Sequence, residues 1–239
     1  MQYRTTRRAA FLQRPNRFIA LCDLDGETVR AHVKNTGRCR ELLVPGCTVY
    51  LEESGNPNRS TAYSLIGVEK GNLRINMDSQ APNRIFQEGV EQGIIALPEM
   101  AGYTLLKGEQ TFRHSRFDFY WESPTARGFV EIKGVTLEEG GRAYFPDAPT
   151  ERGIKHLQEL SQAVGEGYCG SLVFIVQMKG VASVTPNWAT HPAFGLAVQA
   201  AQQAGVAVHC YDCQVGPDWV RADTPVPFLL DMPHILALE

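Results

Sequence analysis

Hydrophobic and polar residues alternate over short stretches in the N-terminal third of the chain, as they do in half-buried β-strands. Polar turns separate the stretches, and "DGE" at residues 25–27 is typical of a hairpin turn. The predicted strands cover residues 17–24, 27–33, 47–54, 61–70 and 72–78. Several short strands with polar turns over about 65 residues predict a small barrel of the OB type.

The pattern changes after residue 80, where helical and strand-like segments alternate. The predicted helices cover residues 84–95, 151–164 and 191–205, and Asn83 and Thr150 are the expected N-caps of the first two. The predicted strands cover residues 103–109, 115–122, 128–137, 171–178 and 206–215. This order predicts an α/β domain with a mixed sheet, and hence an α+β chain divided into domains at residues 1–82 and 83–239.

The predicted strand "GFVEIKGVTL", residues 128–137, contains two charged residues within an apolar run. Successive side chains of a strand point to opposite faces, so Glu131 and Lys133 share one face. If the preceding strand forms a hairpin with this one, Asp118 comes close to Glu131 on that face. Neighbouring carboxylates repel each other, and a divalent cation between them removes that cost. A strand that faces water with an ordinary Glu–Lys pair is the alternative.

Magnesium suits such a carboxylate pair because it binds one or two carboxylates, keeps several waters and accepts phosphate oxygens. Lys133 could orient or deprotonate a water, or neutralise charge that develops on the phosphate. Asp118, Glu131 and Lys133 are therefore the candidate catalytic residues, with Mg²⁺ or Mn²⁺ as the expected cofactor.

An Asp followed after about a dozen residues by Glu-x-Lys resembles the PD-(D/E)xK phosphodiesterase core of restriction-type nucleases. The matching residues are Asp118, Glu131 and Lys133. In that family a preceding helix often supplies a further acid, which makes Glu88 a third candidate metal ligand beside Asp118 and Glu131.

A second resemblance extends over nearly the whole chain. The segments that carry it are "RPNRFIA", "AHVKNTGR", "LLVPG", "APNR", "SRFDF", "VEIKGVTL", "FPDAPTERGIKHLQEL" and "FIVQ". In this order they resemble the sugar fermentation stimulation protein A family. The resemblance implies an N-terminal OB-type domain joined to a PD-(D/E)xK domain, DNA binding without sequence preference, and a link to the regulation of maltose metabolism. Nuclease activity is implied by the predicted site and not by the family.

The charge distribution favours a binding surface in the first part of the chain. The net charge is −3, but residues 1–84 hold 13 Lys and Arg against 8 Asp and Glu, and residues 85–239 hold 10 against 18. Such an asymmetry indicates a basic surface on one half and an acidic centre on the other, unless the surface charges are simply scattered. The candidate nucleic-acid-binding residues are Arg14, Arg17, Lys34, Asn35, Arg38, Arg40, Arg84, Arg116, Arg152, Lys155 and His156.

The predicted helix 151–164 places polar residues on one stripe, opposite its apolar face. They are Arg152, then Lys155 or His156, and Glu159. Basic groups at a helix N-terminus oppose the helix dipole unless an anion such as a phosphate is bound there. The stripe therefore indicates a phosphate contact, and a solvated helix face is the alternative.

The expected location is the cytoplasm, without a membrane segment, because no apolar run approaches the roughly 18 residues that a membrane helix needs. The N-terminus has arginines but no apolar stretch after them, unlike a secretory signal. Two function classes stay open: a DNA-binding protein that uses a nuclease-like domain as a scaffold, and an active magnesium-dependent nuclease acting on DNA or RNA. A small-molecule phosphodiesterase is a third alternative.

Overall fold

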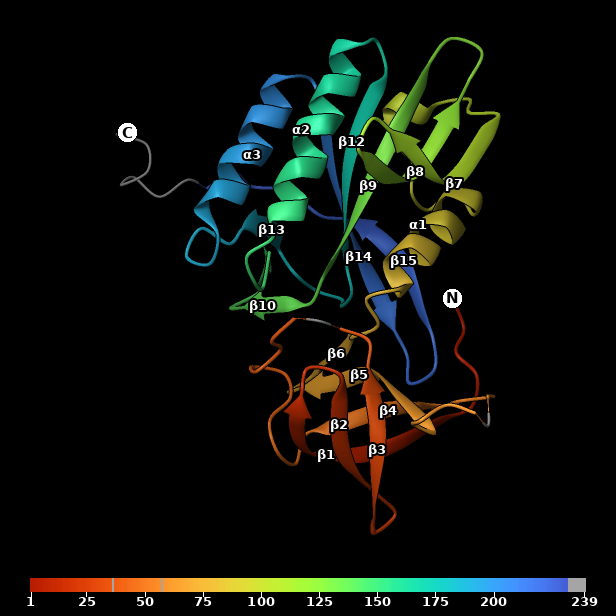
Figure 1. Cartoon of the computed structure of the whole chain (residues 1–239), viewed down its shortest axis with the longest axis vertical. Coiled ribbons are helices and arrows are strands. Elements are labelled where there is room, and N and C mark those ends of the chain that lie inside the picture. The colour runs from red at the N-terminus through yellow and green to blue at the C-terminus, as the bar shows by residue number, and fades with distance from the viewer. Residues whose placement is uncertain (36, 57, 232–239) are drawn as a thin grey trace.

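The N-terminal part of the chain forms a five-stranded barrel with the connectivity of an OB fold (Figure 1). The computed structural model describes residues 1–35, 37–56 and 58–231. The barrel strands are β1 (Thr6–Asn16), β2 (Ile19–Leu24), β3 (Glu27–Val33), β4 (Thr48–Glu53) and β5 (Tyr63–Lys70). Strand β1 pairs with β2 and β4, and a parallel pairing of β3 with β5 closes the barrel. The sequence prediction of an OB-type barrel is therefore confirmed.

The prediction was wrong about which strands form the barrel. Strand β1 precedes the predicted strands, whereas β6 (Leu73–Asn76) only extends β5 beyond the barrel. Two register shifts, between Phe11 and Gln13 and between Gln13 and Asn16, interrupt the pairing of β1 with β2. Because each shift breaks the alternation of side chains, β1 does not show the period of two that the sequence analysis relied on.

The rest of the chain forms a mixed six-stranded sheet in the order β15-β14-β12-β9-β8-β7. Its strands are β7 (Leu105–Phe112), β8 (Ser115–Glu122), β9 (Arg127–Val135), β12 (Cys169–Val176), β14 (Ala207–Val215) and β15 (Val220–Pro225). Strands β9, β12 and β14 are parallel, and the outer pairings are antiparallel. The predicted mixed sheet is confirmed, but β15 was missed because only Val220 and Ala222 of its six residues are buried and apolar.

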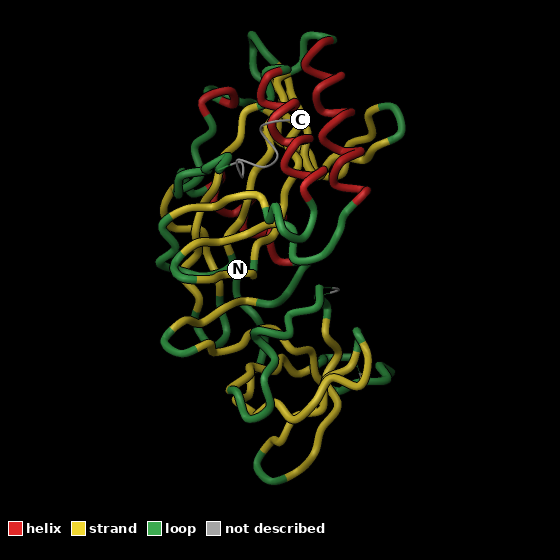
Figure 2. Tube along the Cα trace, turned by 90° about the vertical axis from the view of Figure 1, so that its left-hand side faces the viewer, coloured by secondary structure: helices red, strands yellow, loops and turns green. Residues whose placement is uncertain are grey.

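Helices cover both faces of this sheet (Figures 1 and 2). Helices α2 (Glu151–Gly165) and α3 (Pro192–Gln203) pack on the face that carries Leu172 and Phe174, and α1 (Ala81–Glu91) packs on the face that carries Val173 and Ile175. A short 3-10 helix, η1 (Pro98–Met100), follows α1. In the described part of the chain no helix is long and apolar enough to cross a membrane.

A small three-stranded sheet lies beside the larger one and was not predicted. It consists of β10 (Leu137–Glu139), β11 (Arg142–Phe145) and β13 (Ser183–Pro186). Strands of three or four residues are too short for a hydrophobic period to emerge from the sequence. The parallel pairing of β11 with β13 joins segments about 40 residues apart in the chain, which no local pattern reveals.

The two expected helix caps had different outcomes. Thr150 caps α2 as predicted, since its hydroxyl accepts a hydrogen bond from the backbone N–H of Gly153 at 3.0 Å. Asn83 does not cap α1, because the helix already begins at Ala81 with Gln80 in the N-cap position. Asn83 therefore lies inside the first turn of α1, where its side chain can form a contact outside the helix.

Buried polar contacts fix the barrel against the second domain. The backbone N–H of Asn76 in β6 donates to the carbonyl of Gln177, and the Gln177 side chain donates back to the Asn76 side chain at 2.7 Å. At the other end of the contact, Lys70 forms an ion pair with the buried Glu138 at 2.7 Å. Because leaving any of these buried groups unpaired is costly, the two domains are held in one arrangement.

Candidate active site

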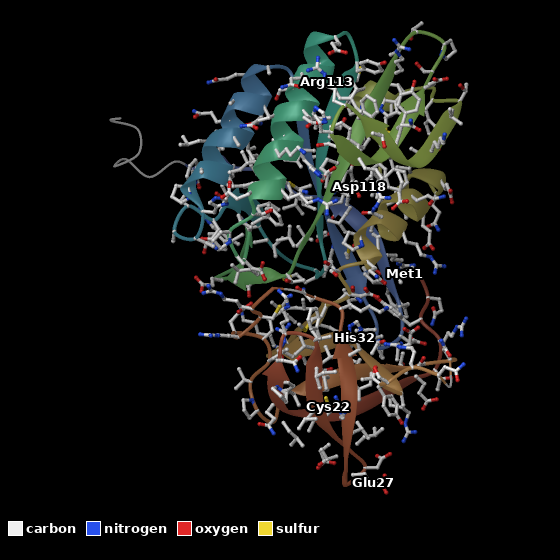
Figure 3. All side chains as sticks on the ribbon, in the orientation of Figure 1. Met1, Cys22, Glu27, His32, Arg113 and Asp118 are labelled. Carbon is white, nitrogen blue, oxygen red and sulfur yellow. The ribbon has the colours of Figure 1, made fainter. Side chains whose placement is uncertain are left out.

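Asp118 lies on β8 at the point where β8 and β9 part. The pairing of these antiparallel strands ends at Phe119 and Val130, and the Asp118 carboxylate then accepts a hydrogen bond from the backbone N–H of Ile132 at 2.7 Å. Figure 3 labels Asp118 in the region where α1 and α2 flank the sheet. The Asp118 carboxylate thus takes the place of a backbone carbonyl as the acceptor for the N–H of Ile132, and this hydrogen bond keeps it next to β9.

Glu131 and Lys133 point to the same face of β9, as the strand alternation predicted. The Lys133 ammonium is 2.6 Å from Glu131 Oε1, and Nδ1 of His156 on α2 is 2.5 Å from the same oxygen. The Glu131 side chain is only 3% exposed. Its other oxygen, Oε2, is buried and has no hydrogen-bond partner among the residues that the structure describes.

The two carboxyl groups have pKa values displaced in opposite directions. Burial raises the pKa of Asp118, and the negative charge of Glu131 raises it further. Burial alone would also raise the pKa of Glu131, but the hydrogen bond from His156 and the charge of Lys133 outweigh it and lower the pKa below its usual value. Glu131 is therefore an ionised carboxylate in a buried setting, next to a second acid that resists ionisation.

This donor set fits a hard divalent cation such as Mg²⁺. The ion needs only one or two carboxylates from the protein and completes its coordination with waters and phosphate oxygens. Across residues 1–35, 37–56 and 58–231, no three His, Cys, Asp or Glu side chains form a closed metal-binding cluster. The site is instead a pair of acids with one unpartnered buried oxygen, and an unpartnered buried carboxylate oxygen is costly unless a cation or water binds it.

Glu88, the predicted third acid, lies elsewhere. Its carboxylate is 2.7 Å from the N-terminal amine of Met1 and 2.7 Å from Arg84 Nε. Although burial raises the pKa of Glu88, hydrogen bonds from these two groups outweigh it and lower the pKa. We therefore leave Glu88 out of the candidate site.

Asn83 is the residue of α1 that reaches the site. Its side-chain amide donates a hydrogen bond to Asp118 Oδ1 at 2.8 Å. Asn83 was predicted to cap the helix, so this role was not foreseen. The helix begins three residues earlier than predicted, and Asn83 lies within its first turn instead of capping it.

On α2 the predicted polar stripe is divided between the surface and the interior. His156 and Glu159 are buried, and Glu159 accepts a hydrogen bond from the backbone N–H of His114 at 3.2 Å. His156 was predicted to contact nucleic acid, but it is buried and its ring faces Glu131. Arg152 and Lys155 are exposed, and Arg152 Nε donates to His156 Nε2 at 3.3 Å.

Arg14 was predicted to bind nucleic acid, but its guanidinium is used to hold a loop. It donates hydrogen bonds of 2.7–2.9 Å to the backbone carbonyls of Arg17, Asn35, Gly37 and Arg38. A phosphate contact would have to replace these bonds, so Arg14 shapes the loop that presents other residues.

Lys34 and Asn35 are also engaged within the protein. Lys34 forms an ion pair with the buried Asp78 at 2.8 Å, and the buried Asn35 side chain accepts a hydrogen bond from the backbone N–H of Gly37 at 2.8 Å. The ion pair ties the loop after β3 to the segment that precedes α1, and the Asn35 hydrogen bond lies within that loop. Both side chains thus have partners within the protein, which the sequence pattern did not indicate.

The remaining predicted cations lie on the surface. They are Arg17, Arg38, Arg40, Arg84, Arg116, Arg152 and Lys155. Arg84 and Arg116 form surface ion pairs with Glu88 and Glu109, which contribute little free energy and are easily exchanged for a phosphate.

Strand β3 carries basic residues that the sequence pattern did not single out. Arg30 is exposed on this strand, and burial together with the positive charges of Arg59 and Lys34 lowers the pKa of the neighbouring His32. Arg59 and Lys34 thus place positive charge near His32, although burial has the larger effect on its pKa. Strands 2 and 3 of OB folds form the face on which nucleic acids commonly bind, so this cluster belongs with the candidate interface.

Comparison with known protein families assigns both halves of the chain. Residues 12–77 match the SfsA N-terminal OB domain, and residues 80–219 match the sugar fermentation stimulation protein RE domain, where RE stands for restriction endonuclease-like. The chain belongs to the sugar fermentation stimulation protein (SfsA) family. The resemblance recognised in the sequence is thereby confirmed.

SfsA relatives match along nearly the whole chain. A sugar fermentation stimulation protein homolog of Desulfitobacterium hafniense (strain DSM 10664 / DCB-2) is 54% identical over 222 residues, which cover 93% of this chain and 95% of the relative. The homolog of Clostridium beijerinckii is 45% identical over 230 residues, covering 96% and 100%. The structure of Pyrococcus furiosus SfsA in complex with Ca²⁺ is 27% identical, with a TM-score of 0.86 and coverage of 96% and 98%.

The opposite pKa displacements predict opposite effects of two isosteric substitutions on metal-free protein. The pKa of folded Asp118 is raised, so its ionisation costs stability above the folded pKa, and this cost vanishes below about pH 3.9, the unfolded value. The pKa of folded Glu131 is lowered, so its ionisation stabilises the fold above about pH 4.3 and the contribution is lost as the pH falls through the folded pKa.

We therefore expect Asp118→Asn to raise the free energy of unfolding at pH 7 in EDTA. Asn83 can rotate its amide to keep the hydrogen bond. Glu131→Gln should lower the free energy of unfolding, by on the order of 2 kcal/mol, because it weakens hydrogen bonds to a charged group. Urea denaturation at pH 7 and at pH 4.5 measures both. The Asp118→Asn difference should shrink at pH 4.5, whereas the Glu131→Gln difference should largely persist, because pH 4.5 lies above the folded pKa of Glu131. A loss of stability in Asp118→Asn at pH 7 contradicts the repulsion between the two acids.

Proposed function

We propose that this SfsA-family protein binds nucleic acid, in the first place DNA, without sequence preference, and that its RE domain hydrolyses phosphodiester bonds. In this proposal Asp118 and Glu131 hold a divalent cation, Mg²⁺ or Mn²⁺. The observation that carries the proposal is the buried Oε2 of an ionised Glu131 beside Asp118, which has no hydrogen-bond partner in the described part of the chain. A cation supplies the missing partner and also lowers the repulsion between the two carboxylates.

The chemistry of the site follows from the positions of its side chains. When bound, the ion would polarise the phosphate and lower the pKa of a bound water. Lys133 places its ammonium next to the same carboxylate and is 15% exposed, so it can reach a bound substrate. There it would orient the attacking water or neutralise the charge that builds on the phosphate in the transition state. Asn83 and the backbone of Ile132 keep Asp118 in place.

The relative from Pyrococcus furiosus supports the choice of cation. That protein is described in complex with Ca²⁺, and it is 27% identical to this chain over a match that covers 96% of this chain and 98% of the relative. Calcium and magnesium both prefer carboxylate and other oxygen ligands, so a calcium-binding relative favours a hard-cation site in this chain.

The exposed cations of the barrel support nucleic-acid binding through the phosphate backbone. Arg17, Arg38 and Arg40 are exposed, and the Arg17 guanidinium stacks 4.6 Å from the centre of the Phe18 ring. Exposed guanidinium groups attract the phosphates of a nucleic acid whatever its base sequence. Binding of DNA at such a surface would be the route to the regulation of sugar metabolism that the family resemblance implies.

Replacing Lys133 by Ala tests the catalytic part of the proposal. We expect Lys133→Ala to lower the rate of Mg²⁺- or Mn²⁺-dependent cleavage by on the order of 10²-fold, because the ammonium acts on charge that develops in the transition state. Affinity for the nucleic acid should change little. The assay incubates single- and double-stranded DNA and RNA with each metal or with EDTA. Lys107→Ala, on the exposed strand β7, is the matched control and should cleave like the wild type.

Two outcomes of this assay count against hydrolysis at this site. If the wild type cleaves none of the four substrates with either metal, the RE domain is a scaffold for binding and not a hydrolase. If Lys133→Ala cleaves at the wild-type rate, the activity comes from another centre. If the single variants Asp118→Asn and Lys133→Ala each lose cleavage, the result supports the proposed metal-binding role of Asp118 and the proposed catalytic role of Lys133.

Replacing Arg17, Arg38 and Arg40 together by Ala tests the binding part. We expect weaker binding to a DNA duplex and a shallower dependence of the affinity on salt, because each lost phosphate contact reduces the slope by about one. Fluorescence anisotropy between 50 and 300 mM KCl, conditions within the range where counterion release dominates, measures both quantities. A triple replacement of Arg127, Arg142 and Arg221 removes the same charge from exposed positions of the second domain. Equal effects of the two triples would mean that net charge alone governs binding.

A further inference from the structure

We propose that His156 is a positioning residue for the metal-binding carboxylate. Its side chain would turn Glu131 so that one oxygen is held by protein donors and the other is left for the cation. The inference rests on the proposed function, since it assigns a role within the same site. It adds a residue of α2 that lies outside the Asp, Glu and Lys pattern of the site.

The hydrogen bonds around His156 determine which of its nitrogens carries the proton. Arg152 Nε can only donate, and it lies 3.3 Å from His156 Nε2, so Nε2 accepts. The proton is then on Nδ1, which lies 2.5 Å from Glu131 Oε1 and donates to it. Arg152 therefore fixes the tautomer in which His156 donates to the carboxylate.

Both protein donors act on the same oxygen of Glu131. His156 Nδ1 and Lys133 Nζ lie 2.5 and 2.6 Å from Oε1, whereas Oε2 is buried without a described partner. A carboxylate held through one oxygen has its second oxygen fixed in direction as well, because the group is planar. The arrangement presents Oε2 ready for a cation, which lowers the cost of ordering the ligand when the ion binds.

The imidazole ring is itself held in place by packing. His156 is 5% exposed, and the ring of Phe117 on β8 meets it edge to face at a centroid distance of 6.1 Å. The helix that carries it is anchored by the Thr150 cap and by buried Leu157 and Leu160. Lys133, by contrast, reaches Glu131 with a flexible four-carbon side chain. His156 is thus the rigid member of the two donors.

Ion binding to three His156 variants tests the inference, because Asn and Gln carry the same amide at different positions. The Asn side chain places its N–H₂ near the position of Nδ1, and the longer Gln side chain places it near Nε2. We expect His156→Ala and His156→Gln to weaken Mn²⁺ binding by about 10- to 100-fold, as is typical for partners of metal ligands. His156→Asn should stay within a few-fold of the wild type. Gln158→Ala, an exposed position two residues along α2, is the matched control and should bind normally.

Isothermal titration calorimetry with Mn²⁺ gives the affinities, and thermal unfolding in EDTA gives the stability of each variant without metal. Wild-type affinity in a folded His156→Ala variant overturns the inference but leaves the proposed function intact. No Mn²⁺ binding by the wild type overturns both. If all three variants, Asn included, lose affinity in proportion to their loss of melting temperature, His156 supports the fold and does not position Glu131. Rescue by Asn and not by Gln supports the inference.

Discussion

A buried carboxylate with one unsatisfied oxygen is the constraint around which the second domain is organised. Glu131 is almost fully covered, yet it is ionised, because His156 and Lys133 donate to one of its oxygens. A charge in such a place is costly unless it is paired. The other oxygen remains without a described partner, next to Asp118 at the point where two strands separate. The fold tolerates this local cost, and a bound cation would offset it.

Elements far apart in the chain meet at this point. A hydrogen bond links Asn83 of α1 to Asp118 of β8, and another links His156 of α2 to Glu131 of β9. Helices from both faces of the sheet therefore contribute to the site. The barrel is fastened to the same domain through the Asn76–Gln177 contact, so its basic surface keeps a fixed relation to the site. In the proposed function this arrangement lets one part of the molecule hold the phosphate backbone while another acts on it.

The sequence predicted the chemistry of the strands better than that of the helices. Glu131 and Lys133 were correctly predicted to share one face because side chains alternate strictly between the two faces of a strand. Asp118 was predicted to lie near Glu131 because a short hairpin turn restricts how two neighbouring strands can pair. Helix residues depend on where the helix begins. Because α1 starts earlier than predicted, Asn83 contacts Asp118 in the site instead of capping the helix. Glu88 is bound to Met1 and Arg84 and not to the site. Likewise, whether a basic residue is free or bonded to backbone, as Arg14 is, depends on tertiary contacts that the sequence does not display.

The most direct test of this account is the position of a bound ion. Crystals of the protein grown with Mn²⁺ and measured at the manganese absorption edge locate the metal by its anomalous signal. The account predicts a peak within bonding distance of Glu131 Oε2 and of the Asp118 carboxylate, with Glu131 Oε1 still bonded to His156. A peak elsewhere in the molecule, or a Glu131 that keeps Oε2 unbound at saturating Mn²⁺, would contradict it.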